Sequence, residues 1–203
     1  AAAFGLTDGA ADWARRTVNG TALRETQGFL GGQSLGALSF GDQVDSRALT
    51  VGSEHQFGNG VSFALSGTVG RSNSNANAGQ GLLQVGQDGV TTTAYQAAVA
   101  KTGLFGKTDQ LRLTFAQPLT VENGRLEVQT FDVVDRATGQ LGLVADAIAL
   151  NGARRRHVAE MIYATPVFKG AGDISFFGQV DTAPLLTPNE TAHTMGLRFT
   201  SRF

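Results

Sequence analysis

The clearest alternation in the chain lies at residues 61–69, which read Val61-Ser62-Phe63-Ala64-Leu65-Ser66-Gly67-Thr68-Val69. Apolar side chains stand at positions 61, 63, 65 and 69, and small or polar ones stand between them. Successive side chains of a strand point to opposite faces, so this stretch predicts a β-strand with one apolar face and one polar face. The preceding Phe57-Gly58-Asn59-Gly60 predicts a tight hairpin turn, because Gly and Asn tolerate positive φ.

The same alternation recurs along most of the chain. It is found around Leu49 and Val51 and again over 111–116, 125–129, 174–181 and 194–203. We count about ten strands from Gly28 onward, each close to the roughly 9–11 residues that a tilted membrane-spanning strand needs.

Composition narrows the class of protein. The chain has 203 residues, enough for one domain, with 16 Lys+Arg against 17 Asp+Glu, which gives no reason to expect nucleic acid as a partner. Charged residues make up 16%, below the roughly 25% of a soluble domain, which suggests that part of the surface does not face water. The chain has no Cys, so disulfides and thiolate metal sites are excluded, and no apolar run is long enough for a transmembrane helix.

The first 27 residues differ from the rest. Thr7 or Asp8 could cap a short helix over residues 10–16, where one acid followed by two arginines suits the helix dipole. Such a helical or linker segment could plug a barrel lumen, lie outside it, or form a disordered tail. The predicted fold is therefore all-β, an antiparallel up-and-down transmembrane β-barrel over 28–203 of about ten strands, or of twelve, with a short N-terminal helix or plug at 1–27.

The connections between strands predict a topology. Short turns are expected at 57–60, 105–108 and 169–172 on one side, and longer polar loops at 72–90 and 182–190 on the other. Short periplasmic turns and longer external loops are the usual asymmetry of outer-membrane barrels. Three connections fit less well, because 121–124 and 151–155 are short but would lie outside, and loop 135–143 would lie inside.

Several charged residues occupy the alternate strand positions that we assign to the barrel interior. They are Arg112, Glu127, Glu160, Arg198 and Arg202. Facing hydrocarbon, each would cost about 2–4 kcal/mol at mid-depth, whereas in a wet lumen they can pair across strands. The alternation fits a soluble β-sandwich binding module equally well, because the polar side of each strand would then face solvent.

The last strand carries a further signal. Leu197, Phe199 and Phe203 alternate with polar residues up to a terminal aromatic. This pattern looks like the C-terminal signature read by the barrel assembly machinery of the bacterial outer membrane, although Ser201 departs from its usual apolar residue.

One block of sequence resembles a known family. The block runs Thr102-Gly103-Leu104-Phe105-Gly106-Lys107-Thr108-Asp109-Gln110-Leu111-Arg112-Leu113, then Ala116-Gln117-Pro118-Leu119-Thr120-Val121-Glu122-Asn123-Gly124, and later Gly152-Ala153-Arg154-Arg155-Arg156 and Tyr163-Ala164-Thr165-Pro166. Over roughly 91–203 the chain resembles the C-terminal translocator barrel of subtilisin-like serine protease autotransporters of alphaproteobacteria, particularly sphingomonads. The resemblance implies an outer-membrane barrel of about twelve strands that exposes a preceding passenger. The sequence holds no passenger, so either the start has been cut away, or the chain is a stand-alone barrel serving as an accessory or structural subunit of an envelope complex.

No catalytic or cofactor site is expected. Residues 103–108 only superficially resemble a phosphate-binding loop, because two residues rather than four separate the glycines. His55, His157 and His193 have no ligand spacing, and there is no Gly-x-Ser-x-Gly motif. The expected partners are outer-membrane lipid and lipopolysaccharide, the barrel assembly machinery, and a passenger or envelope subunits.

Overall fold

The computed structural model describes residues 2–11, 14–25, 28–29, 32–33, 44–74, 83–151, 154–184, 187 and 189–201. Within these ranges the protein is all-β and antiparallel, and its one helical element is the 3-10 turn η2 (Phe168–Gly170). The strands are β1 (Ala2–Ala11), β2 (Ala14–Glu25), β3 (Gly28–Phe29), β4 (Gly32–Gln33), β5 (Val44–Phe57), β6 (Val61–Ser74), β7 (Leu83–Val85), β8 (Val90–Thr102), β9 (Gln110–Asn123), β10 (Arg125–Asp135), β11 (Gln140–Ala149), β12 (Val158–Val167), β13 (Gly172–Asp181) and β14 (Ala192–Ser201).

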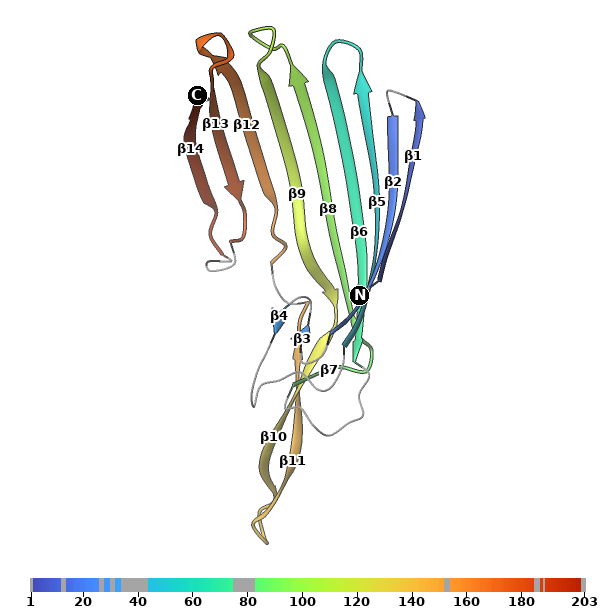
Figure 1. Ribbon diagram of the computed structural model, residues 1–203. Coiled ribbons are helices and arrows are strands. Elements are labelled where there is room, and N and C mark those ends of the chain that lie inside the picture. The colour runs from blue at the N-terminus through green and yellow to red at the C-terminus, as the bar shows by residue number, and fades with distance from the viewer. Residues whose placement is uncertain are drawn as a thin grey trace.

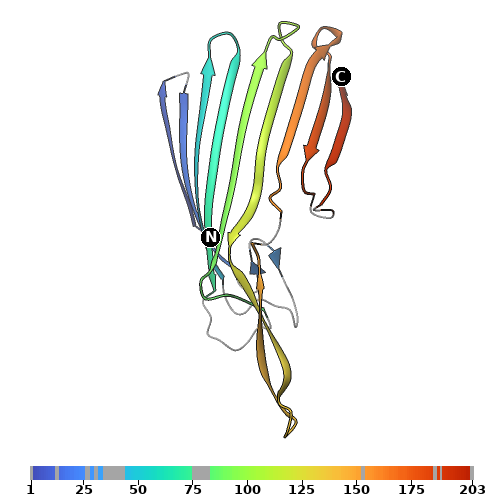
Figure 2. The ribbon, with the colours of Figure 1, turned by 180° about the vertical axis from the view of Figure 1, so that it is seen from behind.

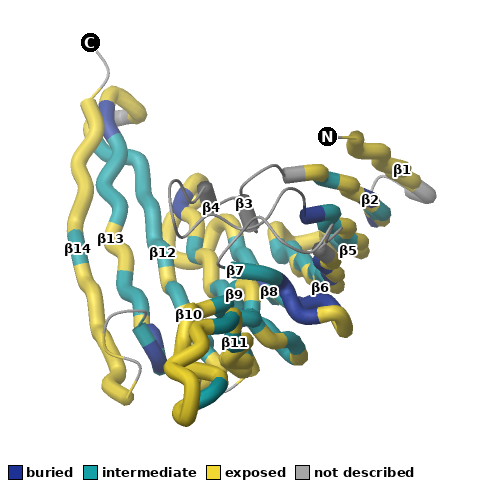
Figure 3. Tube along the Cα trace, turned by 90° about the horizontal axis from the view of Figure 1, so that it is seen from below, coloured by how far each residue is buried: buried dark blue, intermediate teal, exposed yellow. Residues whose placement is uncertain are grey.

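Nine of these strands form one large sheet in the order β1-β2-β5-β6-β8-β9-β12-β13-β14. Each strand in this order pairs antiparallel with its neighbour, so the sheet is an up-and-down meander (Figure 1). With nine alternating strands, the edge strands β1 and β14 run in the same direction. Seen along the strands, the sheet is curved, with β12, β13 and β14 at one side and β1 and β2 at the other (Figure 3).

The prediction of an N-terminal helix is wrong. Strands β1 and β2 occupy most of the first 27 residues, and β2 pairs with β5 from Ala14↔His55 to Glu25↔Val44. Residues 12 and 13 of the expected helix lie outside the described residues. Local helix propensity is a weak preference, and a twelve-residue ladder to a neighbouring strand outweighs it. These strands extend the main sheet, so the described part of residues 1–27 is no separate helical plug.

Two of the expected spanning strands belong to a separate hairpin. Strands β10 and β11 pair with each other and, through β7, form a three-stranded sheet apart from the large one. Figures 1 and 2 place this hairpin beyond one end of the large sheet. The chain leaves the large sheet at Gly124, which has a φ of 150°, a conformation that favours glycine. A Cβ atom added at this position would lie 2.6 Å from Val90 Cγ2, so there is no room for a side chain.

The connections divide into two ends. The turns β5–β6, β8–β9 and β12–β13 lie along one edge, here named the turn end, and the β10–β11 hairpin extends from the opposite edge, the loop end (Figure 1). At the turn end Asn59 and Gly60 adopt φ of 80° and 76°, as expected for the 57–60 turn. The expected loop 135–143 is corrected to a short turn at 136–139 at the tip of the hairpin, and it lies at the loop end instead of the turn end.

The buried core is small. The described buried hydrophobic side chains are Ala14, Val44, Val85, Val90, Ala98 and Ala183. Val44, Val85 and Val90 form one cluster with Val121, Leu126 and Leu150 packed against it. This cluster lies where the β10–β11 hairpin joins the large sheet, so it anchors the hairpin and leaves most of the sheet without a covering layer.

Candidate functional site

One face of the large sheet, here named the apolar face, carries large hydrophobic side chains that are exposed. In register across the strands they include Phe4, Leu49 and Val69 in one row, Leu6, Val51 and Tyr95 in the next, and Phe63, Val99, Leu113, Met161 and Met195 in another. Leu65 is 48% exposed, Val69 58% and Leu197 71%. Exposed apolar surface of this extent marks a surface that is covered by something other than water.

The apolar run on β6 is nine residues long. On β6 the alternation from Val61 to Val69 covers eight residue steps, or about 26 Å along the strand at about 3.3 Å per residue. The apolar band of outer-membrane barrels is about 25 Å tall, and a strand of this length tilted by about 40° would cover about 20 Å of that height.

Aromatic rings meet at two levels of the apolar face, one at the turn end and one in the rows of Leu65 and Gly67. Nearer the loop end, Phe115 stacks on His157 with ring centroids 5.7 Å apart, and Tyr95 lies 6.2 Å from Phe115. At the turn end Phe105 meets Tyr163 edge to face at 5.8 Å, and Phe168 meets Phe199 at 6.2 Å. Amphipathic rings favour the boundary between apolar and aqueous surroundings, and the rings at the turn end lie at such a boundary of the apolar face.

The opposite face, here named the polar face, carries mostly small and polar side chains, with Ile162 and Phe177 as exceptions. Thr50 and Thr68 hydroxyls hydrogen-bond at 2.8 Å across β5 and β6, and Ser46 and Ser72 do so at 2.8 Å. Arg15 lies directly opposite Glu54 on this face. Polar pairs of this kind stabilise a sheet face that borders water.

The structure places three of the five charges expected in a lumen on the polar face of the large sheet, in different rows. Arg112, Glu160 and Arg198 lie on the polar face of β9, β12 and β14. Glu127 lies elsewhere, on β10 in the three-stranded sheet, with its carboxylate 3.8 Å from Arg125 Nε, because the chain leaves the large sheet before it. Arg202 lies outside the described residues.

The expected assembly signal is described in part. Leu197 and Phe199 both lie on the apolar face of the edge strand β14, which pairs with β13. Phe203 lies outside the described residues.

The turn between β8 and β9 is built around Asp109, a residue that sequence reasoning did not single out. The residue is 1% exposed, and its carboxylate accepts hydrogen bonds from the backbone N–H groups of Leu104 at 2.9 Å and Phe105 at 2.7 Å and from the Tyr163 hydroxyl at 3.0 Å. Burial raises the pKa of Asp109, but the hydrogen bonds from Phe105, Gly106, Tyr163 and Leu104 outweigh it, so the pKa lies below its ordinary value. The sequence signal that could have indicated this role is the position of the Asp shortly after the Gly-Leu-Phe-Gly turn.

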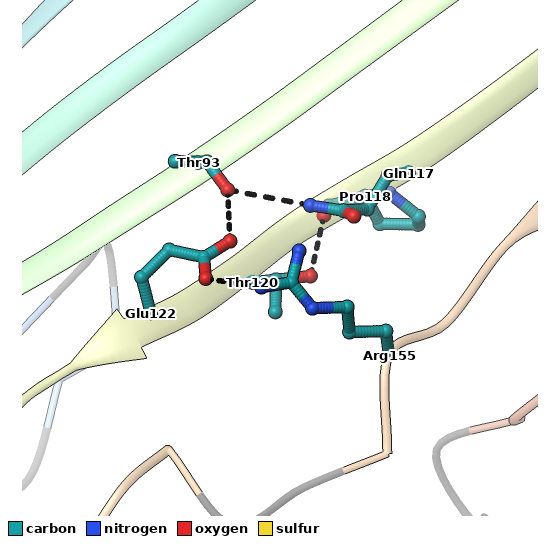
Figure 4. Close-up of polar contacts among 6 residues, drawn as sticks. All are labelled: Thr93, Gln117, Pro118, Thr120, Glu122 and Arg155. Carbon is teal, nitrogen blue, oxygen red and sulfur yellow. Dashed lines mark hydrogen bonds and ion pairs between the residues drawn. The ribbon is translucent and has the colours of Figure 1, made fainter.

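A polar network fastens the return from the hairpin to the sheet (Figure 4). Glu122 accepts hydrogen bonds from the Thr93 hydroxyl at 2.6 Å and from Arg155 Nη2 at 2.6 Å, and Gln117 donates to Thr93 at 3.3 Å. The pairing of β8 with β9 shifts register beside this network, between Thr93 and Tyr95. A register shift of this kind bends the strand, and here it lies where β9 departs towards the hairpin.

The next residues continue this attachment. Arg156 forms an ion pair with Asp181 at 2.6 Å, and His157 N donates to the Thr182 hydroxyl at 3.0 Å. The arginine-rich stretch noted in the sequence therefore ties the β11–β12 connection to both β9 and β13.

The described residues contain no group of three metal-ligating side chains. In the same part of the chain, no helix has the length and hydropathy to cross a membrane. No family model matches the sequence, and neither does a curated protein or a solved structure.

Proposed function

We propose that the chain is a bacterial outer-membrane β-barrel, in which the apolar face meets lipid and the polar face lines the interior. The observation that carries this proposal is the row-by-row exposure of large hydrophobic side chains on one face of a nine-stranded sheet that has almost no buried core in the described residues. In water such a face would associate or aggregate, whereas hydrocarbon covers it without a second layer of protein.

Two further observations support the membrane assignment. The aromatic contacts lie at two levels of the apolar face, and the tight turns gather at the end opposite the hairpin. Short turns belong at the periplasmic end and longer loops outside the cell. A soluble β-sandwich would need a second sheet over the apolar face, and the three-stranded sheet joins the large sheet at its loop end instead.

The direction of the edge strands sets how such a barrel closes. Because β1 and β14 run the same way, direct contact between them would be parallel. Closure with antiparallel pairs alone needs an odd number of additional strands, and three would give the twelve strands implied by the resemblance to autotransporter translocators. Within this proposal the barrel is the translocator and membrane anchor of a passenger.

Cell fractionation tests the membrane assignment. The protein should sediment with the outer membrane, resist extraction with urea, and migrate as a compact species on gels unless heated. Recovery from the soluble periplasm would contradict the proposal and support a soluble module.

A second experiment separates a translocator from a stand-alone accessory barrel. A folded reporter domain fused ahead of Ala2 should appear on the surface of intact cells, where an antibody detects it. If the barrel inserts normally but the reporter stays inside the cell, the translocator role is contradicted and the membrane assignment is not.

A further inference from the structure

The apolar face changes character at the loop end. Arg47 of β5 and Arg71 of β6 are directly opposite each other, and both are exposed. They share the face of Leu49 and Val69, which are directly opposite each other and lie two residues nearer the turn end on each strand. A pair of cations therefore borders the apolar band on the side of the longer connections.

This arginine pair is unfavourable without an anion. Side chains directly opposite in neighbouring strands have Cβ atoms about 5 Å apart, and like charges in that position repel. Arg71 donates to the Asn73 side chain at 3.3 Å and to the Asp88 carbonyl oxygen at 3.3 Å, and neither acceptor carries a charge. The Asp88 carboxylate is paired with Arg125 at 2.9 Å.

A hollow lies beside the pair. It has a volume of about 350 Å³ and is lined by Ala2, Ala22, Leu23, Arg24, Asp45, Ser46 and Arg47. Ala2, Ala22, Arg47 and Arg71 follow one another across β1, β2, β5 and β6, so small side chains leave space next to the cations. Arg24 and Asp45 form an ion pair at 2.8 Å. The three arginines and one aspartate around this site leave two positive charges.

We propose that this site binds the phosphate group of a phosphorylated glycolipid of the lipid A type, with the acyl chains lying along the apolar band. Arginine presents several N–H donors in a planar fork that matches phosphate oxygens. The adjoining row of Phe4, Leu49 and Val69 supplies the surface for acyl chains. An amphiphile with an anionic head fits both parts of the site, whereas a free anion would use the cations alone. The inference rests on the proposed function, because it needs the loop end to lie in the outer leaflet.

The test uses the full chain folded in detergent micelles. Binding is measured with three probes, namely lipid A, lipid A stripped of its phosphates, and inorganic phosphate. The double variant R47Q/R71Q is compared with the control K107Q/R136Q, which removes two exposed cations from turns at opposite ends of the molecule. A cation beside an anionic lipid surface contributes about a factor of five, so the double variant should bind lipid A on the order of 30-fold more weakly. The control should bind as the parent does.

Three results would overturn the site. Equal binding of lipid A by R47Q/R71Q and the parent removes the arginines from recognition. Equal binding of the dephosphorylated lipid reduces recognition to the acyl chains, and inorganic phosphate competing as well as lipid A assigns the site to a free anion. The proposed function is tested separately, because a parent chain that fails to insert into lipid vesicles contradicts both proposals, whereas an inserted chain indifferent to lipid A contradicts only this one.

Discussion

Asp109 shows how a single carboxylate can fix a turn. It accepts hydrogen bonds from two backbone N–H groups and the Tyr163 hydroxyl, and an amide in its place could not accept all of them while keeping its own N–H groups satisfied. We expect D109N to lower the thermal unfolding midpoint of the micelle-folded protein. The control D146N, at an exposed position of β11, should leave the midpoint unchanged. Equal midpoints for D109N and the parent would show that the turn forms without this carboxylate.

The lowered pKa of Asp109 determines how the contribution of this carboxylate to stability depends on pH. A carboxylate whose pKa is lower in the folded state stabilises the fold fully above its unfolded pKa of about 4, and the contribution is lost as pH falls through the folded value. The gap in unfolding midpoint between the parent and D109N should therefore be largest near neutral pH and shrink below pH 4. A gap that widens in acid would contradict this assignment.

Leu113 and Thr114 are neighbours in sequence on opposite faces of β9. Leu113 is 43% exposed on the apolar face, and Thr114 lies opposite Glu160 on the polar face. L113R should destabilise the inserted barrel by about 2–4 kcal/mol if the residue lies near mid-membrane, while T114R should cost little because Glu160 can pair with it. Urea titration of both variants folded in vesicles measures the difference. Similar costs at the two positions would argue against a lipid-facing apolar face.

At the scale of elements, the hairpin β10–β11 and the turn β8–β9 mark opposite ends of the protein. Arg136 lies in the exposed hairpin tip and Lys107 in the exposed turn, and trypsin cleaves after both residue types. Trypsin added to intact cells should cut after Arg136 and spare Lys107, and permeabilised cells should lose this protection of Lys107. Mass spectrometry of the fragments identifies the site. Cleavage at Lys107 in intact cells would reverse the topology.

Alternation predicted strands of the large sheet from β5 onward, because each has two different faces, but it missed β1 and β2. Residues 61–69 and the 57–60 turn are where the sequence placed them. The same signal misassigned Leu126 and Val128 of β10, since a two-faced hairpin outside the large sheet alternates in the same way. Residues 14–16 were misread as part of a helix because their pairing with β5, which is distant in sequence, leaves no local trace.

The candidate sites were predictable to different degrees. The face of the sheet on which Arg112, Glu160 and Arg198 lie was predictable, because side chains alternate between the two faces along a strand. This prediction needs no information about distant residues. Glu122, Arg155 and Asp181 act through contacts across 25 to 33 residues, so their partners depend on which strands become neighbours. Arg47 and Arg71 gain their meaning only from strand register, which a single sequence does not specify.

At the scale of the whole molecule, the central claim is that one face of a single curved sheet meets lipid. The chain has no Cys, so single cysteines can be introduced along β6 without background labelling. The most direct measurement places a fluorophore at each position from Phe63 to Val69 in vesicle-inserted protein, and records quenching by brominated lipid. The account predicts quenching with a period of two, strong at 63, 65, 67 and 69 and weak at 64, 66 and 68. Uniform quenching along the strand, or quenching strongest at the even positions, would contradict it.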